Sequence, residues 1–399
     1  MAASAPGPVL ELRGLGFLNR GAELMLLAIL ERFAARSPAL RFALAPRPEA
    51  PFEARARLGL LQKFELRFRG LPLHGLGRGI PPLLRARYGL VLDRELGAVL
   101  DGSGFAYSDQ WGVLGRRRCE ELAYLAKRCA RREAPLILLP QAFGPFRERA
   151  TARAMGAVLA QKPLIFARDR ASEAALLALG GDPDRILCAP DFTNLLPAAD
   201  LGPEGSLGSN GFFMVPNARL VDRGQAGARD AYLSLLTRFA EGAQRQGLTP
   251  FFLLHEGEGD RALAEAVNAR LAVPLAVVMA TDPRVLKAHL GSACGGLADR
   301  YHALVGALSQ GVPAYAVGWS HKYGALFEDY AWPEGLLPRD LSPEGVEACL
   351  AALGDSNRRG ALSARLTAAA AAQRSASEAM WTRVEAELSQ AGLLEDAPS

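Results

Sequence analysis

Residues 136–172 read LILLPQAFGPFRERATARAMGAVLAQKPLIFARDRAS, and they decide the fold class. Two short, unbroken apolar runs, Leu136–Leu139 and Leu164–Ala167, flank a helical pattern over Arg147–Gln161. Strands have this brief, unalternating character when helices cover both faces of a parallel sheet. The stretch therefore predicts a strand, a helix and a second strand of an α/β fold.

The same alternation of strand and helix patterns extends along most of the chain. Further strands are predicted at Val9–Leu12, Leu90–Leu92, Ala98–Leu100, Phe212–Val215, Phe251–Leu254, Leu275–Met279 and Ala314–Val317. Further helices are predicted at Ala22–Ala34, Arg116–Arg131, Ser172–Leu179, Asp230–Arg245, Asp260–Arg270, Tyr301–Ser309 and within Gly360–Gly392. This order favours doubly wound sheets.

A chain of 399 residues is too long for one ordinary core and indicates two domains. Residues 197–210 read PAADLGPEGSLGSN, which is rich in Pro, Gly and Ser and typical of a linker. We therefore predict a first Rossmann-like domain at 1–197, a linker at 198–210 and a second Rossmann-like domain at 211–358. A cleft is expected between the two domains, and 359–399 is expected to form a C-terminal helix and tail.

Charge and cysteine usage exclude two classes of site. The formal net charge of +4 is small, and no arginine cluster is interleaved with aromatic residues, so nucleic-acid binding is not expected. The five cysteines form no C-x-x-C pair and have no zinc spacing, so no metal site is predicted.

The N-terminus lacks the basic start of a signal peptide, and the longest apolar run, Leu24–Leu30, is far shorter than a membrane span. A cytoplasmic enzyme is therefore expected, and peripheral contact with the inner face of the membrane stays open. The sequence does not indicate an oligomeric state.

Polar residues follow the predicted strands, where open α/β sheets bind their ligands. Such positions include Asp101-Gly102-Ser103-Gly104, Gln141, Arg168-Asp169, Asn217-Ala218-Arg219, His255-Glu256 and His321-Lys322. A guanidinium and an imidazole also enter an apolar helix together at Arg300-Tyr301-His302. Charges at the ends of apolar elements favour an anionic ligand.

Each of these pieces also has a purely structural interpretation. Asp101–Gly104 is compatible with a simple turn, and Arg168-Asp169 with a first helical turn that carries a surface ion pair. Arg300 and His302 are compatible with a helix start and a core histidine. The glycine-rich turn Gly14–Glu23 has neither the dinucleotide nor the P-loop spacing, and it is compatible with a tight turn and a helix cap.

Taken in order, the motifs resemble those of the polysaccharide pyruvyl transferase family over about residues 10–330. They are Asn19-x-Gly21-Ala22-Glu23, Asp101-Gly102-Ser103-Gly104, Pro140-Gln141-x-x-Gly144-Pro145-Phe146, Arg168-Asp169-x-x-Ser172, Pro190-Asp191, Arg300-x-His302-Ala303-Leu304, Gly311-Val312-Pro313 and Lys322. One departure lies in the N-terminal turn, where many members have an acidic residue before the position of Glu23.

The resemblance implies a glycosyltransferase-B-like pair of Rossmann domains, with the acceptor bound by the first and the donor by the second. It also implies phosphoenolpyruvate as donor co-substrate, no further cofactor, and a glycan or lipid-linked sugar as acceptor. The product is a pyruvyl ketal that bridges two hydroxyls. The family's phosphoenolpyruvate-binding arginines match Arg168 and Arg300, and its histidine matches His302.

Chemistry assigns roles within this scheme. Phosphoenolpyruvate carries nearly three negative charges, which suits bidentate arginines and Lys322. His302 is predicted to act as acid/base or phosphate contact, and Asp101 or Glu23 to handle the acceptor hydroxyl. The predicted catalytic residues are His302, Arg300 and Asp101, and the predicted substrate-binding residues are Arg168, Arg300, Lys322, Asn19, Glu23, Ser103, Gln141 and His255.

Two other functions stay open at this point. A nucleotide-sugar glycosyltransferase or epimerase has the same double-Rossmann architecture, and Glu328 or Asp329 is suitably located in the sequence to bind a ribose. The other alternative is a non-catalytic glycan-binding protein, although the set Arg168, Arg300, His302 and Lys322 argues against lost activity.

Overall fold

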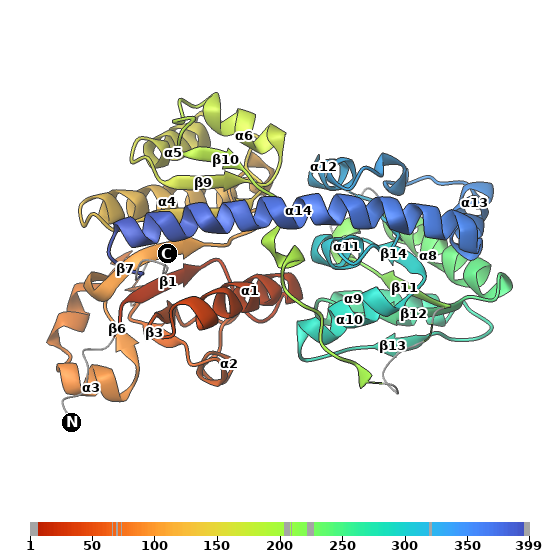
Figure 1. Cartoon of the computed structure of the whole chain (residues 1–399), viewed down its shortest axis with the longest axis horizontal. Helices are drawn as coiled ribbons and strands as arrows, with labels where there is room; N and C mark the ends of the chain where they lie inside the picture. Colours follow the sequence, from red (N-terminus) through yellow and green to blue (C-terminus); the bar gives the residue numbers. More distant parts are fainter. Residues whose placement is uncertain are drawn as a thin grey trace. The chain divides into compact units, whose positions relative to one another are not determined.

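The computed structural model describes residues 7–65, 67–68, 71–72, 74–202, 208, 210–221, 227–318 and 321–394. The chain divides into two compact units (Figure 1). The first unit comprises Met1–Phe17, Met25–Asp191 and Ala376–Ser399, and the second comprises Leu18–Leu24 and Phe192–Ser375.

The first unit is built on an eight-stranded parallel sheet in the order β10-β9-β8-β7-β1-β2-β3-β6. Its strands are β1 (Val9–Arg13), β2 (Arg41–Leu44), β3 (Leu61–Lys63), β6 (Leu90–Val91), β7 (Leu96–Asp101), β8 (Leu136–Gln141), β9 (Leu164–Ala167) and β10 (Ile186–Cys188). The small antiparallel pair β4 (Arg67–Phe68) and β5 (Leu71–Pro72) is separate from it. Every residue of β8 and β9 is buried, as expected for strands covered on both faces.

The second unit is built on a five-stranded parallel sheet in the order β13-β12-β11-β14-β15. Its strands are β11 (Gly211–Val215), β12 (Thr249–Leu253), β13 (Ala276–Val278), β14 (Gly295–Ala298) and β15 (Ala314–Tyr315). The central strands β11 and β14 are buried along their whole length. The hydrophobic core of this unit is continuous from these strands to the helices that follow them.

Helices alternate with the strands in both units. They are α1 (Arg20–Arg36), α2 (Phe52–Arg57), α3 (Pro82–Arg87), α4 (Val113–Ala130), α5 (Arg149–Leu159), α6 (Arg170–Leu177), α8 (Ala228–Arg245), α9 (Gly257–Asn268), α10 (Pro283–Ser292), α11 (Tyr301–Leu308), α12 (His321–Asp329), α13 (Pro343–Gly354) and α14 (Ser356–Gln390). Short 3-10 turns lie at η1 (His74–Gly79), η2 (Asp93–Glu95), η3 (Asp109–Trp111), η4 (Phe192–Asn194), η5 (Ala218–Leu220) and η6 (Pro333–Gly335). Across the described ranges, every helix is too short or too polar to span a bilayer.

The long helix α14 contributes to both cores. In the second unit, Arg374 donates to the Ser309 carbonyl oxygen at 3.0 Å. In the first unit, the Trp381 ring packs edge-on against Phe33 at 5.8 Å between ring centroids. The helix predicted within 359–399 is thus α14, which begins at Ser356 and ends at Gln390, and its part from Ala376 onward belongs to the first unit. Positions 395–399 lie outside the described residues.

The compact units depart from the predicted domain ranges at three places. Residues 18–24 group with the second unit, residues 376–399 group with the first, and the main division falls between Asp191 and Phe192. Within the predicted linker 198–210, positions 203–207 and 209 lie outside the described residues.

The order of the strands places one topological switch point in each sheet. In the first unit the chain leaves β1 for β2 on one side and returns to β7 on the other. In the second unit it leaves β11 for β12 and returns to β14. Ligands of open α/β sheets bind beyond the carboxyl ends of the strands at such points. The residues that follow β11 and β14, and those that follow β1 and β7, are therefore where a site is expected.

Candidate active site

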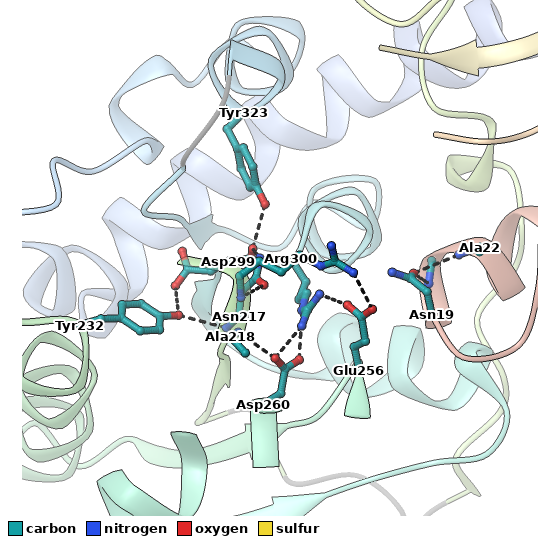
Figure 2. A network of polar contacts seen from close by, with 12 residues as sticks. Asn19, Ala22, Asn217, Ala218, Tyr232, Glu256, Asp260, Asp299, Arg300 and Tyr323 are labelled. Atoms are coloured by element: carbon teal, nitrogen blue, oxygen red, sulfur yellow. Dashed lines mark hydrogen bonds and ion pairs between the residues drawn. The ribbon is translucent and has the colours of Figure 1, made fainter. Parts of the chain in front are cut away.

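In the second unit, Asp299 joins the elements around the switch point. It directly follows β14, and its backbone carbonyl oxygen accepts hydrogen bonds from Asn217 Nδ2 and from the Tyr323 hydroxyl, each at 2.8 Å. Its carboxylate accepts from the Tyr232 hydroxyl at 2.5 Å and from the Val317 backbone N–H at 2.6 Å. One residue thus links the ends of β11 and β15 to helices α8 and α12 (Figure 2).

Burial governs the ionisation of Asp299. The carboxyl group is 1% exposed, and removal from water raises its pKa to about 7, against the opposing effect of the Tyr232 hydroxyl and the Val317 N–H. A buried carboxyl with this many partners is a fixed structural element. It holds the backbone immediately before Arg300 in one conformation.

Arg300 occupies the N-cap position of α11, and its guanidinium is held by two carboxylates (Figure 2). Nε and Nη2 donate to the two oxygens of Asp260 at 3.0 and 2.6 Å, and Nη1 donates to Glu256. Asp260 is fully buried and also accepts a hydrogen bond from the Ala218 N–H at 2.9 Å. The guanidinium that was predicted to clamp a substrate anion is therefore paired with side chains of the protein.

His302 packs directly against the first turn of α1. A Cβ atom built on Gly21 would lie 2.0 Å from His302 Nδ1 and 2.6 Å from its Cγ, so the imidazole fills the space that a side chain at position 21 would need. Asn19 caps this helix, because its Oδ1 accepts from the N–H groups of Gly21 and Ala22 at 2.8 and 3.2 Å. The motifs Asn19-x-Gly21 and Arg300-x-His302 thus meet in space although about 280 residues separate them.

His255 lies among the charges of this site. Its side chain is 5% exposed, and within the described part of the chain its Nε2 atom has no hydrogen-bond partner. Burial is the main cause that lowers its pKa to about 3, and the charges of Arg300, His302 and Arg20 lower it further. His255 is therefore a neutral imidazole at physiological pH, with a buried nitrogen available to a ligand.

Two more cations, Arg20 and Lys322, belong to the same unit. Arg20 Nη1 donates to Glu23 Oε2 at 2.6 Å and to the Thr281 carbonyl oxygen at 3.0 Å. The Lys322 ammonium lies 5.1 Å from the centroid of the Tyr301 ring, and the His302 ring lies 5.7 Å from the same ring. The ammonium and the imidazole thus both lie near the Tyr301 ring.

In the first unit, Asp101 at the end of β7 is the centre of a buried network. Its carboxylate accepts from the Tyr107 hydroxyl at 2.8 Å and from the Ser103 N–H at 3.1 Å, and it pairs with Arg13 at 3.3 Å. Gln141 Nε2 lies 3.3 Å from both the Asp101 carbonyl and Oδ1. Asp101 is fully buried and surrounded by these donors, and its catalytic role stays a prediction.

Arg168 follows β9 and is also paired. Nη1 contacts Asp191 at 3.1 Å, with both side chains almost completely buried, and Nη2 contacts the Gly104 carbonyl oxygen at 3.4 Å. The next residue, Asp169, accepts from the Ser172 N–H at 2.7 Å and caps α6. Asp169 and Ser172 therefore form the start of a helix, as in the structural interpretation of this motif.

The structure brings the predicted site residues together in two groups. Asn19, Glu23, His255, Arg300, His302 and Lys322 belong to the second unit, and Asp101, Ser103, Gln141 and Arg168 belong to the first. The prediction that Arg168 and Arg300 bind one ligand together stays a prediction.

Glu256 was predicted among the polar residues that follow strands, but the sequence pattern did not identify Arg13, Arg20, Tyr107, Tyr232, Asp260 and Asp299 as parts of the two networks. The spacing of Glu256 and Asp260, four residues apart at a helix start, is a signal that could have identified the carboxylate partners of Arg300. Among the described residues, no group of three or more His, Cys, Asp or Glu side chains is arranged to hold a metal ion.

A family model described as "Polysaccharide pyruvyl transferase" matches residues 19–321, which include every predicted site residue except Lys322. A search of curated proteins finds no match.

Solved structures that resemble the chain include the S. aureus MnaA complex with UDP, with a TM-score of 0.60, 12% identity, and coverage of 98% of this chain and 99% of that one. The UDP-GlcNAc 2-epimerase of Neisseria meningitidis, bound to UDP-GlcNAc, has a TM-score of 0.58, 10% identity, and coverage of 94% and 99%. Anabaena HepE in complex with UDP has a TM-score of 0.56, 12% identity, and coverage of 96% and 100%. These likenesses show an α/β fold with two Rossmann-like domains of the glycosyltransferase-B type, as the sequence predicted.

Proposed function

The chain belongs to the polysaccharide pyruvyl transferase family, and from this premise we propose that it uses phosphoenolpyruvate as its donor. The acceptor is a sugar residue of a polysaccharide or of its lipid-linked precursor. The product is a pyruvyl ketal that bridges two hydroxyls of that sugar, and phosphate is released.

One observation carries this proposal, namely the contact between His302 and Gly21. It joins two family motifs at the switch point of the second unit, and the Tyr301 ring lies near both the imidazole and the Lys322 ammonium. Burial is the main cause of the lowered pKa of His255, and the charges of Arg300, His302 and Arg20 lower it further, so all three act on that one ring. A small, highly charged anion matches such an arrangement of cations.

The reaction proceeds in two balanced steps. In the first, an acceptor hydroxyl oxygen bonds to C2 of phosphoenolpyruvate while the methylene carbon takes a proton and becomes a methyl group. In the second, the bond from C2 to the phosphate oxygen breaks, phosphate leaves with the electron pair, and the second hydroxyl oxygen bonds to C2. The acceptor loses two hydroxyl protons in total. One proton is gained by the methylene carbon, which becomes the methyl group, and the other is gained by the released phosphate.

Residues of the second unit supply what these steps require. We assign His302 to proton transfer or to the phosphate, because an imidazole nitrogen can donate or accept a proton or a hydrogen bond. Lys322 and Arg20 supply positive charge for the carboxylate and phosphate, and each charge-assisted hydrogen bond contributes about 1.5–3 kcal/mol. Glu23, which was predicted to handle the acceptor, is paired with Arg20 and is mostly buried, so we propose that it orients Arg20.

Donor binding tests the proposal without a known acceptor. Phosphoenolpyruvate at 100 times its Kd should stabilise the protein by about 2.7 kcal/mol and raise its melting temperature, whereas UDP-glucose should not. The variant Lys322→Met should reduce the shift, and Lys127→Met, at an exposed position of α4, is the matched control. A shift with UDP-glucose and none with phosphoenolpyruvate would contradict the proposal.

A nucleotide-sugar enzyme is the alternative outcome of that experiment. Its predicted ribose ligands, Glu328 and Asp329, are exposed at the C-terminal end of α12, whereas Lys322 is in the first turn. Six residues of helix separate Lys322 from Glu328, which corresponds to about 9 Å along the axis. This position favours the pyruvyl transfer over the alternative.

A further inference from the structure

The two carboxylates that hold Arg300 differ in how firmly the protein holds them. Asp260 has no exposed surface, binds Nε and Nη2 together, and accepts a further bond from the Ala218 N–H. Glu256 is 22% exposed and reaches Nη1 alone. Asp260 therefore holds the Arg300 guanidinium more firmly, and Glu256 is the carboxylate that a ligand would displace from Arg300 more easily.

Glu256 also bridges to a second arginine. Its Oε1 lies 3.3 Å from Arg219 Nη2, while its Oε2 accepts from Arg300. Arg219 is half exposed, so the carboxylate of Glu256 lies between one fixed guanidinium and one at the surface. Two guanidinium groups around one carboxylate form the kind of place that binds a carboxylate or phosphate of a ligand.

The side chain of Glu256 does not cap the helix that follows it. Glu256 is the N-cap residue of α9, yet its side chain makes no capping hydrogen bond to that helix. Release of its carboxylate from Arg300 therefore breaks no capping interaction of α9.

We infer that Glu256 occupies an anion subsite between Arg219 and Arg300, and that the carboxylate or phosphate of the donor displaces it. This inference rests on the proposed function, because that function identifies the donor as phosphoenolpyruvate. It adds Arg219 to the residues that bind the donor. With Glu256 in place, two guanidinium groups face two carboxylates, and a ligand anion would add a surplus negative charge. After displacement, the ligand anion takes over the pairing, and the charge balance is kept.

The variants Glu256→Gln and Glu258→Gln test this inference as a matched pair. Both residues lie at the start of α9, and Glu258 is 93% exposed with its closest cation at 4.0 Å. Glu256→Gln should lower the KM for phosphoenolpyruvate by about threefold to tenfold, as a weak competing ion pair implies. Glu258→Gln should leave KM unchanged, and Arg219→Ala should raise it.

Inorganic phosphate serves as a second probe that requires no transfer reaction. Its Kd, measured from the thermal shift, should fall in Glu256→Gln and stay constant in Glu258→Gln. An unchanged or higher phosphate Kd in Glu256→Gln overturns the subsite, even if phosphoenolpyruvate is consumed. If phosphate binds more tightly to Glu256→Gln but phosphoenolpyruvate is never turned over, the subsite stands and the proposed donor is wrong.

Discussion

Replacement of Gly21 by alanine is the most direct perturbation of the candidate site. The new methyl group would lie 2.0 Å from His302 Nδ1, 2.6 Å from Cγ and 2.7 Å from Cε1. Because Cγ is close to the backbone of residue 302, a simple swing of the ring tip does not relieve the contact. The imidazole has to move by roughly 1.4 Å before ordinary van der Waals distances return.

The expected magnitude follows from two opposing effects on the free energy of unfolding. Alanine is a better helix former than glycine by at most about 1 kcal/mol. Overpacking of a filled site costs about 1–3 kcal/mol. We therefore expect Gly21→Ala to destabilise the protein by about 1 kcal/mol, and the displaced imidazole to reduce kcat by about a hundredfold.

Thermal unfolding and phosphate release from phosphoenolpyruvate measure the two effects. Gly156→Ala is the matched control, because Gly156 lies inside α5 and its added Cβ would meet no atom within 4 Å. That variant should be stabilised by about 0.5–1 kcal/mol, with unchanged turnover.

A second measurement separates the steric clash from a general effect on the helix. In His302→Ala the imidazole is absent, so Gly21→Ala should no longer destabilise when the two are combined. Equal destabilisation by Gly21→Ala with and without the His302 ring would refute the reasoning, as would full activity of the single variant.

Two further predictions concern the surroundings of His302. The variant Tyr323→Phe loses the hydrogen bond to the Asp299 carbonyl oxygen but keeps an aromatic ring next to the Lys322 ammonium. It should raise the KM for phosphoenolpyruvate about threefold to tenfold. The control variant Tyr315→Phe, in β15, should leave this KM unchanged. The pKa of His255 is lowered from 6.5 to about 3, so the unfolded chain binds more protons between these values, and stability should fall as the pH falls through this range. Urea unfolding of His255→Gln should show a shallower decline, and an identical pH dependence would show that the ring is not buried as neutral imidazole.

The sheets were predictable where strands are rich in large apolar residues. Leu136–Leu139 and Leu164–Ala167 lie within β8 and β9, because fully buried parallel strands need continuous apolar sequence. Strand β14 was missed, since its sequence Gly-Gly-Leu-Ala has low strand propensity. The structure explains the glycine, because a Cβ at Gly296 would lie 2.2 Å from the Phe213 backbone oxygen.

Because β14 was not predicted, the position of Asp299 in the site was not predicted either. Asp299 directly follows β14, so a sequence pattern without this strand gives no reason to place a polar residue at a switch point there. The helix α10 was missed as well, although Asp282 accepts from the Arg284 N–H and Pro283 follows it, which is a recognisable helix start.

Arg168 and Arg300 show why the residue type alone overestimates how much positive charge is available to an anionic ligand. Sequence reasoning counted Arg168 and Arg300 as cations ready for a ligand, yet each is paired with a buried aspartate, Asp191 and Asp260. Burial of a guanidinium is costly unless its N–H groups are paired, and at Arg168 and Arg300 an aspartate supplies the pairing. The aspartate also fixes the orientation of the planar guanidinium. The guanidinium N–H groups that the aspartate does not bind are therefore held in a fixed direction, and ordering them costs no further side-chain entropy. The informative feature is therefore the arginine together with its aspartate, because the pair fixes the orientation of the guanidinium.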